Sequence, residues 1–420
     1  MTDLTVTRPA VLDRASTTRT FADLTTLRVG GPIDTYVDTT TEQEFIDVIS
    51  YADAVGLPLL VIGGGSNIVA QDAPFPGIVV RDIRTGVAIE SQDSCGGATV
   101  TVPAGHVWDD LVDDALAAGW VGIECLAGIP GTVGAAPVQN IGAYGQEVAH
   151  VISSVRVWDR KERRARLFAV GELAFAYRDS LLKRTMTDRT TGPLWGPSPR
   201  YIVLAVSFQF RLGTRSAPIA YQELATHLGV DLGDRANTTT VADAVRALRA
   251  RKDMLEDPTG RPPHTQRSAS TNSTDTTAHH DPSYNRWSAG SFFTNPIIAA
   301  SDAANLPHGA PTYPVRTTQS ETTAGPSLGA IDPDHVKTSA AWLIDHAGLH
   351  RGYGLTGHHS PATLSTVHTL ALTNRGTATA TDIRALADHV IAKVHATFGI
   401  TLQPEPVHIT TIPVVDITQD

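Results

Sequence analysis

A turn late in the chain presents a hydroxyl group beside two aromatic rings. Ser291 follows Gly290 and precedes Phe292 and Phe293. No Gly-x-Ser-x-Gly elbow surrounds this serine, so a hydrolase nucleophile is disfavoured. A proton donor or a hydrogen-bonding group is the functional interpretation of Ser291. Hydrophobic anchoring of a loop by the two rings is the alternative.

Two charged residues have types and settings that suit recognition of an acidic substrate. Arg178 stands beside Tyr177, and its fork of donors fits a carboxylate. Pairing with the adjacent Asp179 is the alternative. Glu405 lies between two prolines, which indicates rigid placement of an acid. A turn between a helix and a last strand accounts for the same prolines.

A first glycine turn follows a short apolar run. Gly63, Gly64 and Gly65 precede Ser66 and Asn67. This turn is neither a Walker A loop nor the dinucleotide motif Gly-x-Gly-x-x-Gly. Consecutive glycines let backbone N–H groups approach a pyrophosphate without obstruction by side chains. A plain tight turn is the alternative.

A second segment, residues 128–145, is also rich in glycine and small residues. Such a stretch can lie flat against a planar ring or a phosphate, and the amide of Asn140 can bind the edge of the ring. A close contact between a helix and a sheet is the alternative. The expected cofactor ligands in this segment are Gly128, Ile129, Pro130, Gly131, Thr132, Gly134, Ala135, Asn140 and Gly142.

A strand, a helix and a strand over residues 35–72 must position the first glycine turn. Thr41 and Glu44 form a capping-box pattern, and Gly56 ends the predicted helix. Apolar periodicity predicts further helices over 108–118, 221–228, 241–252, 342–347 and 382–398, and strands over 151–158, 166–170 and 201–212. Residues 257–286 and 301–329 are rich in Thr, Ser, Pro and His, which predicts mobile loops.

The bulk composition excludes several classes of protein. Hydrophobic residues make up 41% of the 420, and no apolar run is long enough for a membrane helix. The net charge is −10, and the densest basic run, residues 160–164, is expected to form a solvated hairpin turn. We therefore expect no nucleic-acid ligand and no membrane insertion.

The N-terminus and the metal-binding residue types predict a cytoplasmic protein without a metal. No basic segment followed by an apolar run opens the chain, so no signal peptide is expected. Cys95 and Cys125 lie far apart and predict two reduced thiols. The histidine pairs at 279–280 and 358–359 lack acidic or cysteine partners at useful spacing, so we interpret both as loop residues.

In their order along the chain, these segments resemble the UDP-N-acetylenolpyruvoylglucosamine reductase family. The match covers most of the chain. Within that family the tyrosine-loop subtype is closest, because Tyr221 follows Pro-Ile-Ala. The segments that carry the resemblance are residues 25–31, 63–67, 128–145, 177–180, 290–293, 341–344 and 404–405.

The resemblance implies an α+β fold. A FAD-binding fold of the vanillyl-alcohol-oxidase (PCMH) type would contain two subdomains, residues 20–72 and 73–213. A C-terminal α/β substrate-binding domain would span residues 214–415 and carry the two insertions. We expect a monomer that binds FAD, NADPH and a UDP-sugar.

The resemblance also implies roles for individual residues. NADPH would reduce FAD, and the flavin N5 would pass hydride to the enolpyruvyl group of the UDP-sugar. Arg178 and Glu405 would stabilise the enolate, and Ser291 would protonate it. Tyr177, Tyr221, Lys252, Asn295 and His346 would be ligands of the substrate or of NADPH.

Three departures from the family pattern and two competing functions stay open at this point. His346 stands where the family usually has glutamine, Pro406 follows Glu405, and the two insertions are longer than expected. A flavin oxidase or dehydrogenase acting on an alcohol or hydroxyacid could share the FAD fold. A regulator that binds a flavin or a nucleotide sugar without chemistry is the other alternative.

Overall fold

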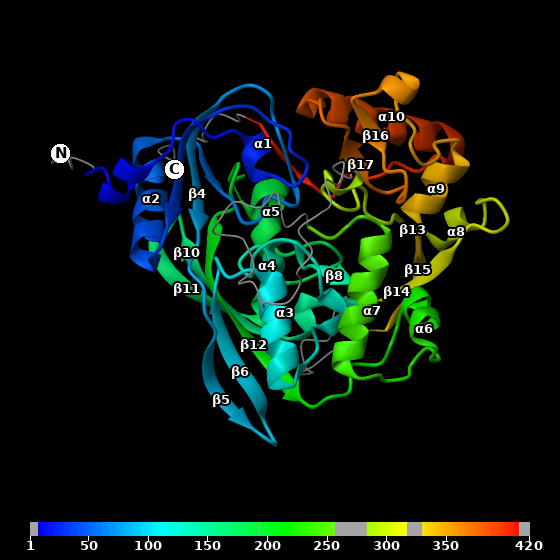
Figure 1. Cartoon of the computed structure of the whole chain (residues 1–420), viewed down its shortest axis with the longest axis horizontal. Coiled ribbons are helices and arrows are strands. Elements are labelled where there is room, and N and C mark those ends of the chain that lie inside the picture. The colour runs from blue at the N-terminus through cyan, green and yellow to red at the C-terminus, as the bar shows by residue number, and fades with distance from the viewer. Residues whose placement is uncertain (1–6, 193, 257–283, 317–329, 411–420) are drawn as a thin grey trace, which may run out of the picture.

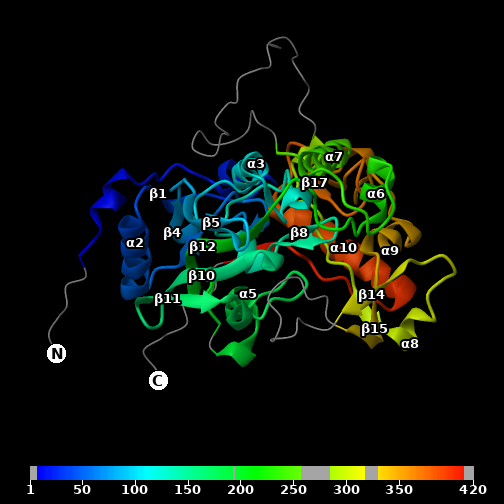
Figure 2. The same cartoon turned by 90° about the horizontal axis from the view of Figure 1, so that it is seen from below.

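The structure is a computed structural model that describes residues 7–192, 194–256, 284–316 and 330–410. Figure 1 and Figure 2 show α2 (Glu42–Val55) and a parallel sheet at one end of the molecule, with α8 (Ala300–Ala303) and α9 (Ala340–His346) at the other. Helix α3 (Trp108–Ala118) and a larger antiparallel sheet lie between these ends. Helices and mainly antiparallel strands are both present, which agrees with the expected α+β fold.

The first sheet holds the strand that leads into the first glycine turn. Its strands are β1 (Ile33–Thr39), β2 (Leu59–Val61) and β4 (Phe75–Asp82), in the order β1-β4-β2, and both pairs are parallel. Strand β4 completes this sheet, although it lies beyond the boundary expected at residue 72. Helix α2 (Glu42–Val55) buries an apolar face against the sheet and ends at Gly56, whose φ is 69°.

The N-terminus of α2 differs in one detail from the expected capping box. Thr41 Oγ1 accepts a hydrogen bond from the Glu44 backbone N–H at 3.1 Å, as expected. The Glu44 carboxylate instead accepts from the N–H of Thr40, at 2.9 Å. The reciprocal bond therefore closes one residue earlier than the pattern predicts.

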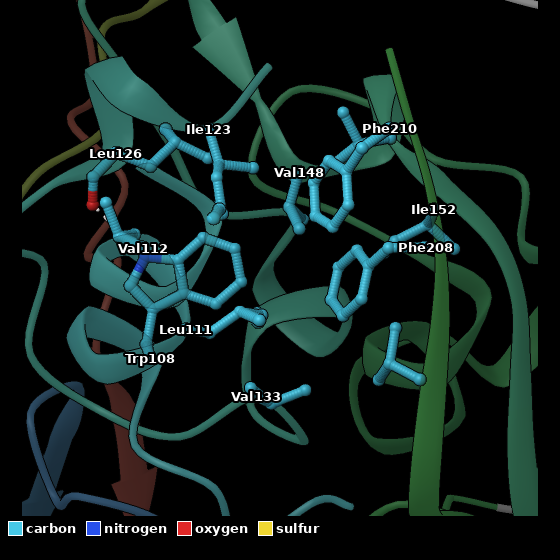
Figure 3. Packing of buried hydrophobic residues seen from close by; sticks show 14 of the residues in the cluster. Trp108, Leu111, Val112, Ile123, Leu126, Val133, Val148, Ile152, Phe208 and Phe210 are labelled. Carbon is cyan, nitrogen blue, oxygen red and sulfur yellow. Dashed lines mark hydrogen bonds between the residues drawn. The ribbon is translucent and has the colours of Figure 1, made fainter. Parts of the chain in front are cut away.

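The second sheet forms the centre of the molecule. Its path is β11-β10-β12-β6-β5, and β7 pairs with β12. The strands are β5 (Ala88–Asp93), β6 (Gly97–Pro103), β7 (Trp120–Val121), β10 (Ile152–Asp159), β11 (Arg164–Ala169) and β12 (Tyr201–Leu212). Helix α3 (Trp108–Ala118) packs on it, and Figure 3 shows Trp108 beside Phe208 and Phe210 in the shared core.

Two helices expected in the C-terminal domain share this central core. Helices α6 (Gln222–Leu228) and α7 (Thr238–Arg251) bury Leu224, Val241 and Leu248 in the same hydrophobic cluster as Trp108. This packing places the helices with the second sheet, although both lie beyond the expected boundary at residue 213.

The basic run at residues 160–164 forms the expected hairpin turn between β10 and β11, but one of its arginines is buried. Asp159 pairs with Arg164 across the two strands. The guanidinium of Arg160 lies 2.5 Å from the Asp53 carboxylate of α2, and only 6% and 7% of the two side chains are exposed. The expectation of a wholly solvated turn is therefore wrong at Arg160, because a distant helix supplies its partner.

The C-terminal region has its own hydrophobic cluster and a small sheet. Helices α9 (Ala340–His346) and α10 (Ala380–Phe398) pack with the hairpin of β16 (Ala362–Leu364) and β17 (Leu372–Asn374). The small sheet has the order β13-β15-β14. Its strands are β13 (Ile297–Ala299), β14 (Thr312–Arg316) and β15 (Ile331–Thr338), and α8 (Ala300–Ala303) follows β13.

Part of the second insertion, residues 301–329, has regular secondary structure. Residues 312–316 form β14 against β15, so the expectation of a mobile loop over 301–329 is wrong for this part. Residues 317–329 lie outside the described residues. Most of the first insertion, together with the histidine pair at 279–280, lies outside them too.

The end of the chain returns to the first glycine turn. Strand β18 (Val407–Ile409) pairs in parallel with β3 (Ile68–Ala70), which follows that turn. Leu27 and Val29 near the N-terminus and Val69 of β3 also pack in the C-terminal cluster. Segments from both ends of the sequence thus meet between the first sheet and the C-terminal helices.

The capping box of α10 gives a prediction about stability. Thr379 Oγ1 accepts from the Asp382 N–H, and the Asp382 carboxylate accepts from the Thr379 N–H. Thr379→Ala should destabilise the protein by about 1 kcal/mol in urea unfolding, because the cap is lost. Thr397→Ala, at an exposed position within the same helix, should change stability much less. Equal midpoints for the two variants would contradict the capping role.

Candidate active site

The Ser291 turn and Glu405 lie on neighbouring segments. The Glu405 backbone N–H donates to the Phe292 carbonyl at 2.8 Å, and Phe293 forms a bridge with Pro404. Phe292 and Phe293 are 0% and 1% exposed, whereas the preceding residue, Ser291, is partly exposed. The rings therefore anchor the loop, and this anchoring fixes the hydroxyl beside the Glu405 segment.

Arg178 pairs with Glu405 rather than with its neighbour in sequence. Arg178 Nε lies 3.0 Å from Glu405 Oε1, and 19% and 15% of the two side chains are exposed. Asp179 pairs instead with Arg184. The structure thus joins the two charged residues that the sequence places in distant segments.

The backbone around Arg178 is held in an uncommon conformation. Its φ is 56°, in the left-handed region. The preceding Ala176 and the following Asp179 form a bridge, and Lys183 Nζ donates to the Arg178 carbonyl at 3.1 Å. Helix α5 (Leu181–Thr187) starts directly after this turn and is capped by Ser180. These contacts aim the guanidinium toward Glu405.

Asn140 and Gly142 support Arg178, a role that the sequence did not reveal. The Asn140 amide is completely buried and donates to the Ala176 carbonyl and to the Glu147 carboxylate, both at 2.9 Å. Its donors are thus used within the protein, whereas we expected them to face a cofactor ring. The Gly142 carbonyl accepts from Arg178 Nη2 at 2.6 Å.

The first glycine turn adjoins the Glu405 segment. The Val407 N–H donates to the Asn67 carbonyl at 2.9 Å, and the Asn67 amide lies 3.4 Å from the Glu405 carbonyl. Pro406 stands between Glu405 and β18, and the Glu405 carboxylate reaches Arg178 in this arrangement. Pro406, which departs from the family pattern, is therefore compatible with the ion pair between Glu405 and Arg178.

The two glycine segments touch each other directly. A Cβ atom on Gly64 would lie 2.7 Å from the Gly131 Cα, and one on Gly65 would lie 1.9 Å from the Leu24 carbonyl oxygen. Ser66 Oγ donates to the Pro130 carbonyl at 3.0 Å. Close contact with neighbouring backbone, in addition to a tight turn, therefore accounts for glycine at positions 64 and 65.

The same contact region also leaves a set of backbone donors free. Among the described residues, the N–H groups of residues 63–67, Gly131 and Thr132 have no hydrogen-bond acceptor. The Gln139 side-chain amide nitrogen at the end of α4 (Ala136–Gln139) is buried and has no partner there either. Adjacent free N–H groups of this kind bind anions, so the backbone donors fit the phosphates of a cofactor. The Gln139 amide fits a polar edge of a cofactor ring.

Three other expected cofactor ligands use their N–H groups within the fold. Gly128 donates to the Asp109 carboxylate, Ile129 to the Leu126 carbonyl and Gly134 to the Ala104 carbonyl. Their backbones therefore shape the segment. Ala135 is exposed, and its N–H donates to the Thr132 carbonyl.

Tyr177 and Asn295 lie near the Arg178 pair, together with a lysine that sequence reasoning missed. Lys337 Nζ of β15 lies 4.8 Å from the centre of the Tyr177 ring, and burial lowers the pKa of this lysine. Asn295 Oδ1 accepts from the Ala340 N–H and so helps to cap α9. A single lysine in a strand gives no sequence signal for this contact.

Tyr221 and Lys252 belong to a second cluster, at the ends of α6 and α7. The half-exposed Tyr221 ring meets the Tyr144 ring edge-on at 5.5 Å, and burial raises the pKa of Tyr144 to about 12. Lys252 Nζ lies 2.7 Å from the Glu223 carboxylate. A phosphate would therefore compete with Glu223 for this ammonium group.

His346 is not brought into either cluster by the contacts of the described residues. Its ring stacks on Trp342 of the same helix with 3.7 Å between centroids, and its Nδ1 lies 2.9 Å from the Trp342 carbonyl. Its side chain is 47% exposed. The role expected for this residue thus has no support from the geometry.

Cys95 is exposed and Cys125 is buried, and both are free thiols. Within the described ranges, no group of three or more potential metal ligands is found, and no helix there has the length and apolarity to cross a membrane.

Comparison with known proteins shows the family. A profile described as the C-terminal domain of UDP-N-acetylenolpyruvoylglucosamine reductase matches residues 281–409, and a FAD binding domain profile matches residues 33–167. The reductase of Cutibacterium acnes is 44% identical, with 92% of this chain and 88% of that protein aligned. The reductase of Streptomyces coelicolor is 41% identical over the same shares.

A solved structure agrees with the fold. The crystal structure of the reductase from Thermus caldophilus aligns with a TM-score of 0.53 over 93% of this chain and 98% of that one, at 22% identity. The α+β architecture, with a FAD-binding part and a C-terminal domain, is therefore confirmed. The chain belongs to the UDP-N-acetylenolpyruvoylglucosamine reductase family, the FAD-dependent oxidoreductases of peptidoglycan precursor synthesis.

Proposed function

We propose that this protein reduces UDP-N-acetylglucosamine enolpyruvate to UDP-N-acetylmuramate in the cytoplasm, as a monomer and with NADPH as reductant. The observation that carries this proposal is the convergence of Arg178, Glu405 and the Ser291 turn beside the free N–H groups of the first glycine turn. Family membership supports the same reaction.

The cofactor site consists of the two glycine segments. The backbone N–H groups of residues 63–67, Gly131 and Thr132 would hold the FAD pyrophosphate, and the Gln139 amide would bind a polar ring edge. Bound FAD supplies a hydride at its N5 atom for transfer to the terminal carbon of the enolpyruvyl group.

Arg178, held by Glu405, would stabilise the negative charge that develops on the substrate during this reduction. Hydride addition to the enolpyruvyl group moves negative charge onto the substrate carboxylate, as an enolate. A guanidinium held in advance stabilises such charge without reorganising during the reaction. Glu405 fixes the Nε side of Arg178, and the Gly142 carbonyl fixes Nη2. Both contacts set the direction in which the guanidinium faces the substrate.

Ser291 completes the reduction by giving a proton to carbon C2 of the enolate. The hydroxyl is partly exposed on a turn whose aromatic neighbours are buried, so its position is fixed although it can still reach a ligand. One hydride and one proton together saturate the carbon–carbon double bond. A fixed hydroxyl is a weak acid, but a carbanionic acceptor makes the transfer feasible.

The substrate would extend over the two clusters that flank this centre. Tyr177, Asn295 and Lys337 adjoin Arg178, and Lys252 with Tyr221 offers an ammonium group and an aromatic ring for the diphosphate and its sugar.

We propose a division into a first FAD subdomain that includes β4, a second FAD subdomain, and a C-terminal substrate domain. Helices α6 and α7 pack on the second subdomain.

An anaerobic two-step experiment tests the proposed function. NADPH should bleach the flavin absorbance of the purified protein, and later addition of UDP-N-acetylglucosamine enolpyruvate should restore it. Flavin that is reduced by NADPH but not reoxidised by this substrate would contradict the proposal. Denaturation should also release free FAD, because the proposal includes no covalent link to the protein.

A further inference from the structure

The hydroxyl of Ser291 has one side-chain neighbour that none of the roles above uses. His368 Nε2 lies 3.3 Å from Ser291 Oγ. We propose that His368 is a positioning residue that donates a hydrogen bond from Nε2–H to Ser291 Oγ and so directs the hydroxyl proton toward the substrate. This inference rests on the proposed function.

The loop between β16 and β17 fixes His368 in this place. Ser365 Oγ accepts from the backbone N–H groups of Val367 and His368, at 3.2 and 3.3 Å. The His368 carbonyl accepts from the Ala371 N–H at 3.0 Å. Because the loop is closed by its own hydrogen bonds, the imidazole ring has a defined backbone support.

A second hydrogen bond joins this loop to the serine turn. The Phe292 N–H donates to the Leu370 carbonyl at 2.7 Å, one residue from Ser291 and two from His368. Phe292 itself is fully buried. The two side chains therefore project from backbones that are tied to each other, and their separation does not depend on flexible chain between them.

The surroundings keep the ring neutral. Burial, together with the positive charges of Lys252, Arg351 and Arg249, lowers the pKa of His368 to about 4. A neutral imidazole carries one N–H donor and one acceptor nitrogen. The ring is thus a hydrogen-bonding group at neutral pH, and a second proton for the substrate does not come from it.

The direction of this hydrogen bond matters for proton transfer. If Nε2 accepted from Ser291, the serine proton would point away from the substrate. If Nε2–H donates, the Oγ hydrogen stays free to bond to carbon C2. As that proton leaves, the negative charge growing on Oγ is stabilised by the Nε2–H dipole and the nearby cations. Ser291 then regains a proton from water, and His368 keeps its own.

Two substitutions at His368 test the proposal. His368→Leu removes the donor, whereas His368→Gln keeps an N–H group. In single-turnover experiments, His368→Leu should slow reoxidation of reduced flavin by the enolpyruvyl substrate about tenfold, the loss expected for one charge-assisted hydrogen bond. His368→Gln should recover most of that rate. Both variants should bind FAD and be reduced by NADPH as the unmodified protein is. His350→Leu, at an exposed histidine, is the matched control.

A double variant separates this role from a merely structural one. If His368 acts only through Ser291, adding His368→Leu to Ser291→Ala should slow reoxidation no further. The proposal would be overturned if the two substitutions slowed reoxidation multiplicatively in the double variant. It would also be overturned if His368→Leu alone slowed both half-reactions equally. A wild-type reoxidation rate in His368→Leu would overturn it too.

A spectroscopic readout keeps this inference distinct from the proposed function. In histidine-labelled FAD-bound protein, the ¹⁵N resonances that disappear in His368→Gln should show a proton on Nε2. A proton on Nδ1 would overturn the inference even if the enzyme turns over. Failure of the unmodified protein to reoxidise with the substrate would contradict the proposed function, and the tautomer would still decide the direction of the hydrogen bond.

Discussion

Replacing Ser291 with alanine should slow substrate-dependent reoxidation of the reduced flavin by about 100-fold or more, the usual loss for a general acid. Reduction of the flavin by NADPH should keep its rate, because that half-reaction delivers a hydride and requires no proton from Ser291. The measurement is anaerobic stopped-flow absorbance of the flavin, with each half-reaction followed separately.

A serine in the same turn provides the control. Ser288 is buried and its Oγ accepts from the Gly290 N–H, so it supports the turn without reaching the exposed side. Ser288→Ala should alter stability more than reoxidation. If Ser291→Ala reoxidised at the wild-type rate, water or another group would have to supply the proton and Ser291 would lose its role.

Local periodicity predicted the elements that form continuous apolar faces. Helix α3 and strand β12 have the bounds expected from sequence, since Trp108, Leu111 and Val112 recur on one helix face and β12 is long and mostly buried. The glycine turns were also recognisable as special. The sequence left open whether they serve the backbone or a ligand, and the geometry supports both. Gly64 and Gly65 are needed for close contact, and their N–H groups find no acceptor in the part of the chain that the structure describes.

Contacts between distant segments could not be predicted in the same way. Strand β14 lies in a stretch rich in Thr and Pro that predicts a loop, yet β15 provides a pairing partner for it. Arg160 stands in a basic run that predicts a solvated turn, yet Asp53 of α2 neutralises and buries it. In both cases the deciding partner belongs to another element, which no local pattern describes.

The candidate site also contains some residues that the sequence predicts and others that only the three-dimensional structure reveals. The sequence and the resemblance predict Arg178, Ser291 and Glu405, and the structure places Arg178 against Glu405 and the Ser291 turn against the Glu405 backbone. Lys337 and His368 could not be predicted from sequence, because a single lysine or histidine in a strand or loop has many ordinary explanations. Their proximity to Tyr177 and Ser291 appears only in three dimensions.

The second large effect is expected from removing Arg178, the cation of the ion pair with Glu405. Arg178→Ala should slow substrate-dependent reoxidation by about 100- to 1000-fold, because it removes the fixed positive charge that faces the developing enolate. Arg178→Lys should recover only part of this rate, since an ammonium group lacks the planar fork that contacts Glu405 and the Gly142 carbonyl together. Single-turnover reoxidation is again the measurement.

Arg184→Ala is the matched control for this prediction. Arg184 lies in the same segment and pairs with Asp179, and neither residue has a contact with Glu405 among the described residues. Its loss should cost at most about 1 kcal/mol of stability, as for other partly exposed pairs, and leave reoxidation close to the wild-type rate. Equal slowing by Arg184→Ala and Arg178→Ala would mean that the segment, rather than the guanidinium, is required.

The role of Glu405 follows from combining its substitution with that of Arg178. Glu405→Ala alone should slow reoxidation, because Arg178 Nε then loses its partner and the guanidinium can turn away from the substrate. In the Arg178→Ala background the same change should add little, since the group that Glu405 holds is already absent. If the two effects multiplied instead, Glu405 would contact the substrate independently of Arg178, and enolate stabilisation would require two separate groups in place of one oriented pair.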